Sequence, residues 1–215
     1  MIYDSVPEIN ELHANAMRQY IDTCSVFRAW ESARETGNKQ RTADLAKAMV
    51  LHQRMNWAIR VGTAPRVLVD ILMRLYKACL SERLTTVGPC SLYAYEMASG
   101  SRLCIPPQPM ERKRLTLVAE DEDIVATALA IAGKADRTFE DDGAMLVNSK
   151  GFELEVIIRE LESVKRFSAV IISTSGHMAR MHTVEATYAC VSGFDDELLK
   201  VLAQMLLECN LRLLR

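Results

Sequence analysis

The sequence has almost no net charge. Its 215 residues include 26 Lys and Arg against 28 Asp and Glu, which gives a formal net charge of −2 at pH 7. A balance this even sets up no overall field that attracts nucleic acid or an acidic membrane surface. We therefore do not expect nucleic acid as a partner, and only local clusters of charge can carry a binding function.

Long apolar runs and cysteine motifs are missing as well. No stretch approaches the roughly 20 residues that a membrane-spanning helix needs, and the first residues do not resemble a secretory signal. None of the six cysteines forms a Cys-x-x-Cys pair, and no histidine stands beside one at metal-ligand spacing. We expect reduced thiols in a cytoplasmic protein, no membrane partner and no structural zinc site.

What the sequence does contain is ample apolar material, 49% of all residues, and this predicts a folded core. In the first third, apolar residues recur at helical spacing. The pair Gly37-Asn38 is expected to end the first of these helices, and a second is expected to open near Thr42. The three helical stretches are Ile9–Phe27, Thr42–Arg60 and Leu68–Cys79.

The spacing changes after residue 80. Leu84–Val87 reads as a short buried strand, and later segments alternate with a period of two, which is typical of strands. Two hairpins are predicted, Ala144–Asn148 with Phe152–Ile158 and Ala169–Ser173 with Met178–Val184, and a helix is expected from Asp195. The pattern indicates an α+β fold. Residues 1–80 form a helical N-terminal region, and residues 81–215 form a sheet core with a C-terminal helix.

The first candidate site is the turn that contains Gly88. A strand that feeds a helix through a glycine leaves backbone N–H groups at the helix N-terminus, where phosphate binds. Ser91 stands at the start of that helix, and the sequence predicts a helix that ends at Gly100. The alternative is a glycine that only turns the chain. The sequence contains no Walker loop and no dinucleotide glycine fingerprint.

Two acidic segments are candidates for a magnesium site. In the predicted strand 152–158, Glu153 and Glu155 point to the same side, so both carboxylates can face one Mg²⁺ ion. Asp121 and Asp123 have an Asp-x-Asp spacing, which on a strand would also aim both side chains one way. The alternatives are a solvated sheet face for the glutamates and a capped first helical turn for the aspartates.

Several segments resemble, in the same order, motifs of one protein family. The first is Val87–Gly100, similar to the family pattern Val-Gly-Thr-x-Ala-Leu-Tyr-Ala-Tyr-Glu-Ala-Ala-Ala-Gly. The others are Arg112–Val118, Lys134–Glu140, Val147–Glu155 and Phe167–Val184. On these motifs the chain resembles the bacterial nucleotidyltransferase-like family of the DNA polymerase beta superfamily, and the likeness covers residues 84–184.

The resemblance implies a mixed sheet with flanking helices and a site for a nucleoside triphosphate. It implies that Gly88 and Ser91 lie near the phosphates and that three acids hold two Mg²⁺ ions. The third acid falls on Glu155, which is the candidate catalytic residue. The interval that should supply the other two, Ser101–Glu111, contains no aspartate and three prolines. Asp121 and Asp123 are then the remaining candidate metal ligands.

Two functions follow from this comparison. One is transfer of a nucleotide from a nucleoside triphosphate to an acceptor, with Mg²⁺ as cofactor. The other is a non-catalytic relative, a pseudoenzyme, that binds a nucleotide or a protein partner. The missing aspartates favour the second, because two-metal chemistry depends on those ligands. The basic strip Arg112–Arg114 is a candidate nucleotide contact or a solvated surface strip, and the N-terminal helices are candidates for binding a protein.

Overall fold

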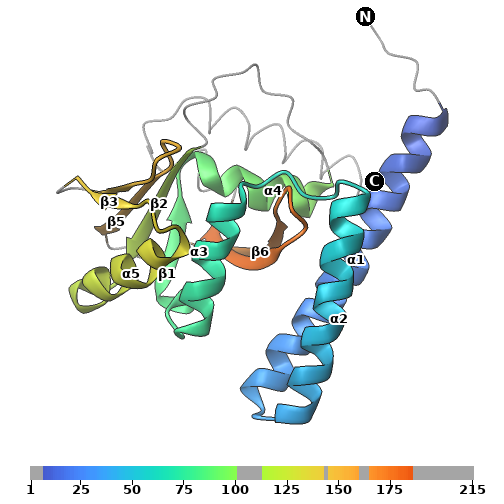
Figure 1. The fold of residues 1–215 in the computed structure, drawn as a ribbon, viewed down its shortest axis with the longest axis horizontal. Coiled ribbons are helices and arrows are strands. Elements are labelled where there is room, and N and C mark those ends of the chain that lie inside the picture. The colour runs from blue at the N-terminus through green and yellow to red at the C-terminus, as the bar shows by residue number, and fades with distance from the viewer. Residues whose placement is uncertain (1–6, 101–112, 143–144, 160–164, 186–215) are drawn as a thin grey trace, which may run out of the picture. The chain divides into compact units, whose positions relative to one another are not determined.

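The computed structural model describes residues 7–100, 113–142, 145–159 and 165–185. Helices come first in the chain and a mixed seven-stranded sheet with flanking helices follows, so the predicted α+β class is confirmed (Figure 1). The chain divides into two compact units. The first is Met1–Arg66 with Ile172–Met178, and the second is Val67–Ile171 with Ala179–Arg215.

The first unit is built on two packed helices, α1 (Pro7–Glu35) and α2 (Lys39–Ala58). Phe27 of α1 is completely buried and its ring lies 5.7 Å from that of Trp30. The expected start of the second helix near Thr42 was three residues late. The reason is that the side chain of Asn38 accepts a hydrogen bond from the Arg41 N–H and so caps α2 at Lys39.

A turn from far along the chain completes this unit. Ala64 forms a β-bridge with Ser173, and the Asn56 side chain donates to the carbonyl oxygen of Gly176 at 3.4 Å. Gly176 lies so close to α2 that an added Cβ would come within 2.0 Å of the Gln53 carbonyl oxygen. The turn therefore packs on the helix through its backbone.

The second unit alternates helices with the strands of the sheet. Helix α3 (Arg66–Lys77) is amphipathic and buries Leu68, Ile71 and Leu75. Helix α5 (Val125–Ala132) packs against strand β5. The other helix is α4 (Leu92–Ser99), and the strands are β1 (Leu84–Val87), β2 (Arg114–Ala119), β3 (Glu140–Asp141), β4 (Leu146–Val147), β5 (Glu153–Ile158), β6 (Arg166–Ile172) and β7 (Met178–Val184).

The sheet order is β3-β4-β5-β2-β1-β7-β6. Strand β1 runs antiparallel to β2 and parallel to β7, while β2 runs parallel to β5. Leu115 of β2 pairs with Leu154 of β5, and both side chains are completely buried. This face of the sheet is therefore part of the apolar core, and polar side chains of β2 and β5 lie on the other face.

Several predicted elements of the core are confirmed. Leu84–Val87 is strand β1, and Gly100 ends α4 in the left-handed conformation. Both predicted hairpins form, as β4 with β5 and as β6 with β7. The predicted helix from Asp195 lies outside the described residues. Over the part of the chain that is described, no helix is long and apolar enough to cross a membrane.

Candidate functional site

The Gly88 turn joins the end of β1 to the helices that follow. Gly88 has φ 73° and ψ −162°, a conformation that is essentially restricted to glycine. The backbone N–H and the hydroxyl of Ser91 both donate to the Gly88 carbonyl oxygen, at 3.0 and 2.6 Å. Among the described residues, apart from Gly88 and its two chain neighbours, no atom lies within 4 Å of the position that a Cβ on Gly88 would take. Ser91 thus holds the carbonyl group of Gly88, and no described residue covers the side of Gly88 where a Cβ would lie.

Ser91 has a structural part in this turn. It is 1% exposed, and its hydroxyl proton is directed at the Gly88 carbonyl oxygen. The same turn is tied to the next strand, because the Cys90 thiol donates to the carbonyl oxygen of Arg114 at 3.1 Å. Ser91 therefore shapes the Gly88 backbone, and its predicted contact with phosphate stays a prediction.

Glu155 lies on β5 beside the first residues of β2. Its carboxylate accepts from the guanidinium of Arg114, with Nη2 and Oε2 2.8 Å apart, and from the Thr116 hydroxyl at 3.4 Å. Arg114 also lies near the second glutamate of this strand, with Nε 3.9 Å from Oε2 of Glu153. The Glu155 side chain is 22% exposed, so solvent still reaches the ion pair.

Strand register brings the Gly88 turn and Glu155 to the same end of the sheet. Val87 pairs with Thr116, and Thr116 pairs with Glu155, so the three residues form one row across β1, β2 and β5. Gly88 follows directly after Val87. Three residues that the sequence singled out, Gly88, Ser91 and Glu155, therefore lie at one end of the sheet, with strand β2 between the Gly88 turn and Glu155.

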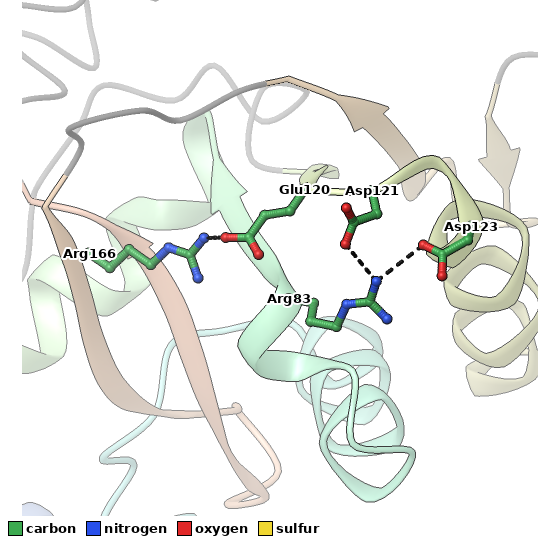
Figure 2. Close-up of polar contacts among 5 residues, drawn as sticks. All are labelled: Arg83, Glu120, Asp121, Asp123 and Arg166. Carbon is green, nitrogen blue, oxygen red and sulfur yellow. Dashed lines mark hydrogen bonds and ion pairs between the residues drawn. The ribbon is translucent and has the colours of Figure 1, made fainter.

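Asp121 and Asp123 lie at the opposite end of β2. A strand rises about 3.3 Å per residue, so the Cα of Asp121 is roughly 15 Å beyond that of Thr116. Both carboxylates point at one guanidinium: Arg83 Nη2 lies 2.6 Å from Asp121 and 3.1 Å from Asp123 (Figure 2). The two aspartates and Glu155 are therefore not gathered around one point, and they do not fit a shared pair of ions.

Asp121 lies at the start of a helical segment, as the capping alternative predicts, but its carboxylate has a different partner. Asp121 does occupy the N-cap position of the short 3-10 turn Glu122–Ile124 that leads into α5, but its side chain makes no capping hydrogen bond. The carboxylate binds Arg83 instead. This hydrogen bond, followed by the charges of Asp123 and Asp121 and opposed by desolvation, raises the pKa of Arg83 above its ordinary value. Arginine is charged at neutral pH in either case.

The same end of the sheet holds further ion pairs that the sequence did not suggest. Arg166 of β6 pairs with Glu120 (Figure 2), and its Nη1 donates to the Glu82 carbonyl oxygen at 2.8 Å. Glu82 in turn lies 3.3 Å from Nε2 of His182. These partners are far apart in the sequence, so no local spacing could have indicated them.

Two of the motif segments form one polar clamp. Asp136 accepts from the N–H and hydroxyl of Thr138 and from the side chain of Asn148, which lies 3.0 Å away. Asn148 in turn accepts from the N–H groups of Lys150 and Phe152. The hydrogen bonds from Thr138, first from its backbone and then from its hydroxyl, lower the pKa of Asp136. The clamp shapes the turn that leads into β5.

The remaining predicted site segments are partly outside the described residues. This holds for the interval Ser101–Glu111 and for Arg112 of the basic strip. Lys113 is described, and its ammonium donates to the carbonyl oxygen of Lys150 at 3.3 Å. Within the described ranges, no group of three or more His, Cys, Asp and Glu side chains is placed to hold a metal ion.

The helical unit carries a buried polar network instead of a charged site. Gln19, Thr23 and Asn56 are almost fully buried. Both Gln19 and Thr23 donate to the side-chain oxygen of Asn56, and His52 Nδ1 lies 3.1 Å from Gln19 Nε2. On the outside of these helices, several large apolar side chains are exposed. They are Ile21, Val50, Leu51, Met55 and Trp57.

Comparison with protein-family models, with curated proteins and with solved structures found no match to this chain.

Proposed function

We propose that this chain binds a nucleotide at the Gly88 end of its sheet, as a relative of nucleotidyltransferases with a degenerate metal site. The observation that carries the proposal is the shared row of Val87, Thr116 and Glu155, which has the Gly88 turn and the Glu155 carboxylate at the same end of the sheet with strand β2 between them. A glycine turn with open space beside it lets a phosphate approach the backbone N–H groups closely.

The positions of the acids support binding over transfer. Two-metal transfer needs carboxylates that converge on paired ions about 3.5–4 Å apart. Asp121 and Asp123 are at the other end of β2 and are held by Arg83, while Glu155 is held by Arg114. Charge compensation for a transferring phosphoryl group is then weak, so we expect little or no turnover with Mg²⁺ and a nucleoside triphosphate.

The binding test uses fluorescent ATP and GTP analogues titrated with the full chain. We expect the wild type to bind and Gly88→Ala to bind at least about tenfold more weakly, because the added Cβ enters the open side of the turn. Gly37→Ala is the matched control. Gly37 also has a positive φ, 68°, and open space around it, but it lies in the turn before α2. If wild type and Gly88→Ala bind the analogues with equal affinity, the nucleotide does not bind at the Gly88 turn.

The transfer test uses a labelled nucleoside triphosphate and Mg²⁺. Wild type, Glu155→Ala and the double variant Asp121→Ala, Asp123→Ala are expected to be equally inactive. Robust transfer that is lost in Glu155→Ala would make the chain an enzyme. Loss in the double variant would make Asp121 and Asp123 displaced metal ligands.

The alternative, a protein-binding relative, is supported by the exposed apolar side chains of α1 and α2, among them Leu51, Met55 and Trp57. The two functions are separated by the nucleotide titration. A well-folded wild type that binds neither analogue leaves protein binding as the better proposal.

A further inference from the structure

Strand β5 presents two carboxylates and a neighbouring hydroxyl on one face of the sheet. Glu153 and Glu155 are two residues apart and so lie on the same side of the strand. Thr116, which pairs with Glu155, adds its hydroxyl oxygen. Oxygen atoms of this kind are the ligands that Mg²⁺ and Mn²⁺ take in proteins. On oxygen ligands alone, this face is a candidate divalent-cation site.

A cation is already present there as a side chain. Arg114 pairs with Glu153 in the strand register and directs Nη2 to Glu155 at 2.8 Å, while its Nε lies 3.9 Å from Glu153. The backbone of Arg114 is fixed twice, by the ladder to β5 and by the Cys90 thiol that donates to its carbonyl oxygen. The strand register therefore brings the guanidinium to the two carboxylates, and its hydrogen bond to Glu155 holds it there.

We propose that Arg114 takes the place of a divalent cation at Glu153 and Glu155, and that this guanidinium keeps the site free of Mg²⁺ in the wild type. The guanidinium neutralises Glu155, and it would repel an ion bound a few ångströms away. Mg²⁺ also gives up its water reluctantly, so a site with so little uncompensated negative charge offers it poor binding. Removal of Arg114 should turn the same oxygens into a metal site. This inference concerns the metal alone and does not depend on nucleotide binding.

The experiment is a titration of the full chain with Mn²⁺, followed by electron paramagnetic resonance of the free ion and by calorimetry. Wild type is expected to bind weakly. Arg114→Gln removes the positive charge and keeps a side chain of moderate length, so it is expected to bind Mn²⁺ at least about tenfold more tightly. Adding Glu155→Gln to that variant is expected to return the affinity to the wild-type level.

Two controls separate the local effect from other causes. Arg74→Gln removes one positive charge from an exposed position of α3 and should leave Mn²⁺ affinity at the wild-type level. Arg114→Lys keeps the charge and should also resemble the wild type. Far-UV circular dichroism checks that each variant is folded. The Arg114 side chain is 44% exposed, so its replacement should not disturb the core.

The proposal fails if the wild type binds Mn²⁺ as tightly as Arg114→Gln, because the guanidinium then excludes nothing. It also fails if a folded Arg114→Gln gains no affinity, because the pair is then only a link between two strands. If Arg74→Gln gains as much Mn²⁺ affinity as Arg114→Gln, the gain comes from the lower net charge of the protein and not from the position of Arg114.

Discussion

Two glycine turns of this protein have similar backbones and very different surroundings. Gly88 and Gly176 have φ angles of 73° and 81°. Beside Gly176 an added Cβ would lie 2.0 Å from the Gln53 carbonyl oxygen, whereas beside Gly88 no atom of the described residues lies within 4 Å. Close packing as well as backbone conformation therefore requires glycine at position 176. At position 88, the described residues show only the conformational requirement.

The comparison implies that Gly176→Ala has the largest effect of the variants considered. The methyl group would overlap backbone atoms of α2, and the alanine residue would also have to adopt a positive φ. We expect a loss of about 3 kcal/mol or more in the free energy of unfolding, measured by urea titration with circular dichroism. If Gly176→Ala loses no more free energy of unfolding than Gly88→Ala, close packing on α2 is not what requires glycine at position 176.

Gly88→Ala should lower the free energy of unfolding by less than Gly176→Ala does, and it should weaken nucleotide binding. Among the described residues nothing would meet the added Cβ, so the expected structural penalty is the strained backbone conformation, about 1–3 kcal/mol in the free energy of unfolding. Nucleotide affinity should fall by more than in Gly37→Ala, which also forces a positive φ on alanine but lies away from the site. Unfolding and fluorescence titrations on the same samples give both quantities. A variant that loses stability but keeps full affinity would assign Gly88 to the chain turn alone.

A third turn contains Gly151 and is held by side chains. Asp136 binds the side chain of Asn148, and Asn148 accepts from the N–H of Phe152, which follows Gly151. The pKa of Asp136 is lower in the folded than in the unfolded chain. The ionised carboxylate therefore stabilises the fold at pH values above 3.8, the ordinary pKa, and this stabilisation is lost as the pH falls through the lower pKa of the folded chain. Asp136→Asn should be less stable than wild type at pH 7, by less than about 1 kcal/mol. The difference should shrink below pH 3.8 in urea titrations. A difference that is constant down to pH 2.5 would contradict this account.

The smallest effect is expected at the far end of β2. The side chains of Asp121 and Asp123 are 58% and 71% exposed, so water and salt screen their attraction to Arg83. The double variant Asp121→Asn, Asp123→Asn should show no measurable shift of the urea midpoint and no change in nucleotide affinity. A loss of nucleotide affinity there would move the site away from Gly88.

The sequence predicted those elements whose cause is local. Alternation and β-branched residues indicated Leu84–Val87 and both hairpins, and Gly88 and Gly100 were expected where the backbone turns. The start of α2 was misplaced, because Asn38 can end one helix or cap the next, and only the hydrogen bond to Arg41 decides.

The arrangement of the charged residues could not be predicted in the same way. Alternation told us which face Glu155 occupies, but its partner Arg114 lies 41 residues earlier, and the pairing depends on the parallel register of β2 and β5. The Asp-x-Asp spacing of Asp121 and Asp123 looks the same on a strand and in a first helical turn. Their contact with Arg83 depends on strand β1 lying beside β2.

The turn at Gly176 also has a consequence for how the chain is made. Asn56 and Gly176 are 120 residues apart, and Gln53 and His177 are 124 apart, yet both pairs are in contact. At about 5–20 residues per second, a ribosome would deliver the turn roughly 6–24 s after α2. During that interval the amide of Asn56 lacks the Gly176 carbonyl oxygen that it binds in the folded protein. We therefore expect the helical unit to complete its packing only after the turn at Gly176 has been synthesised.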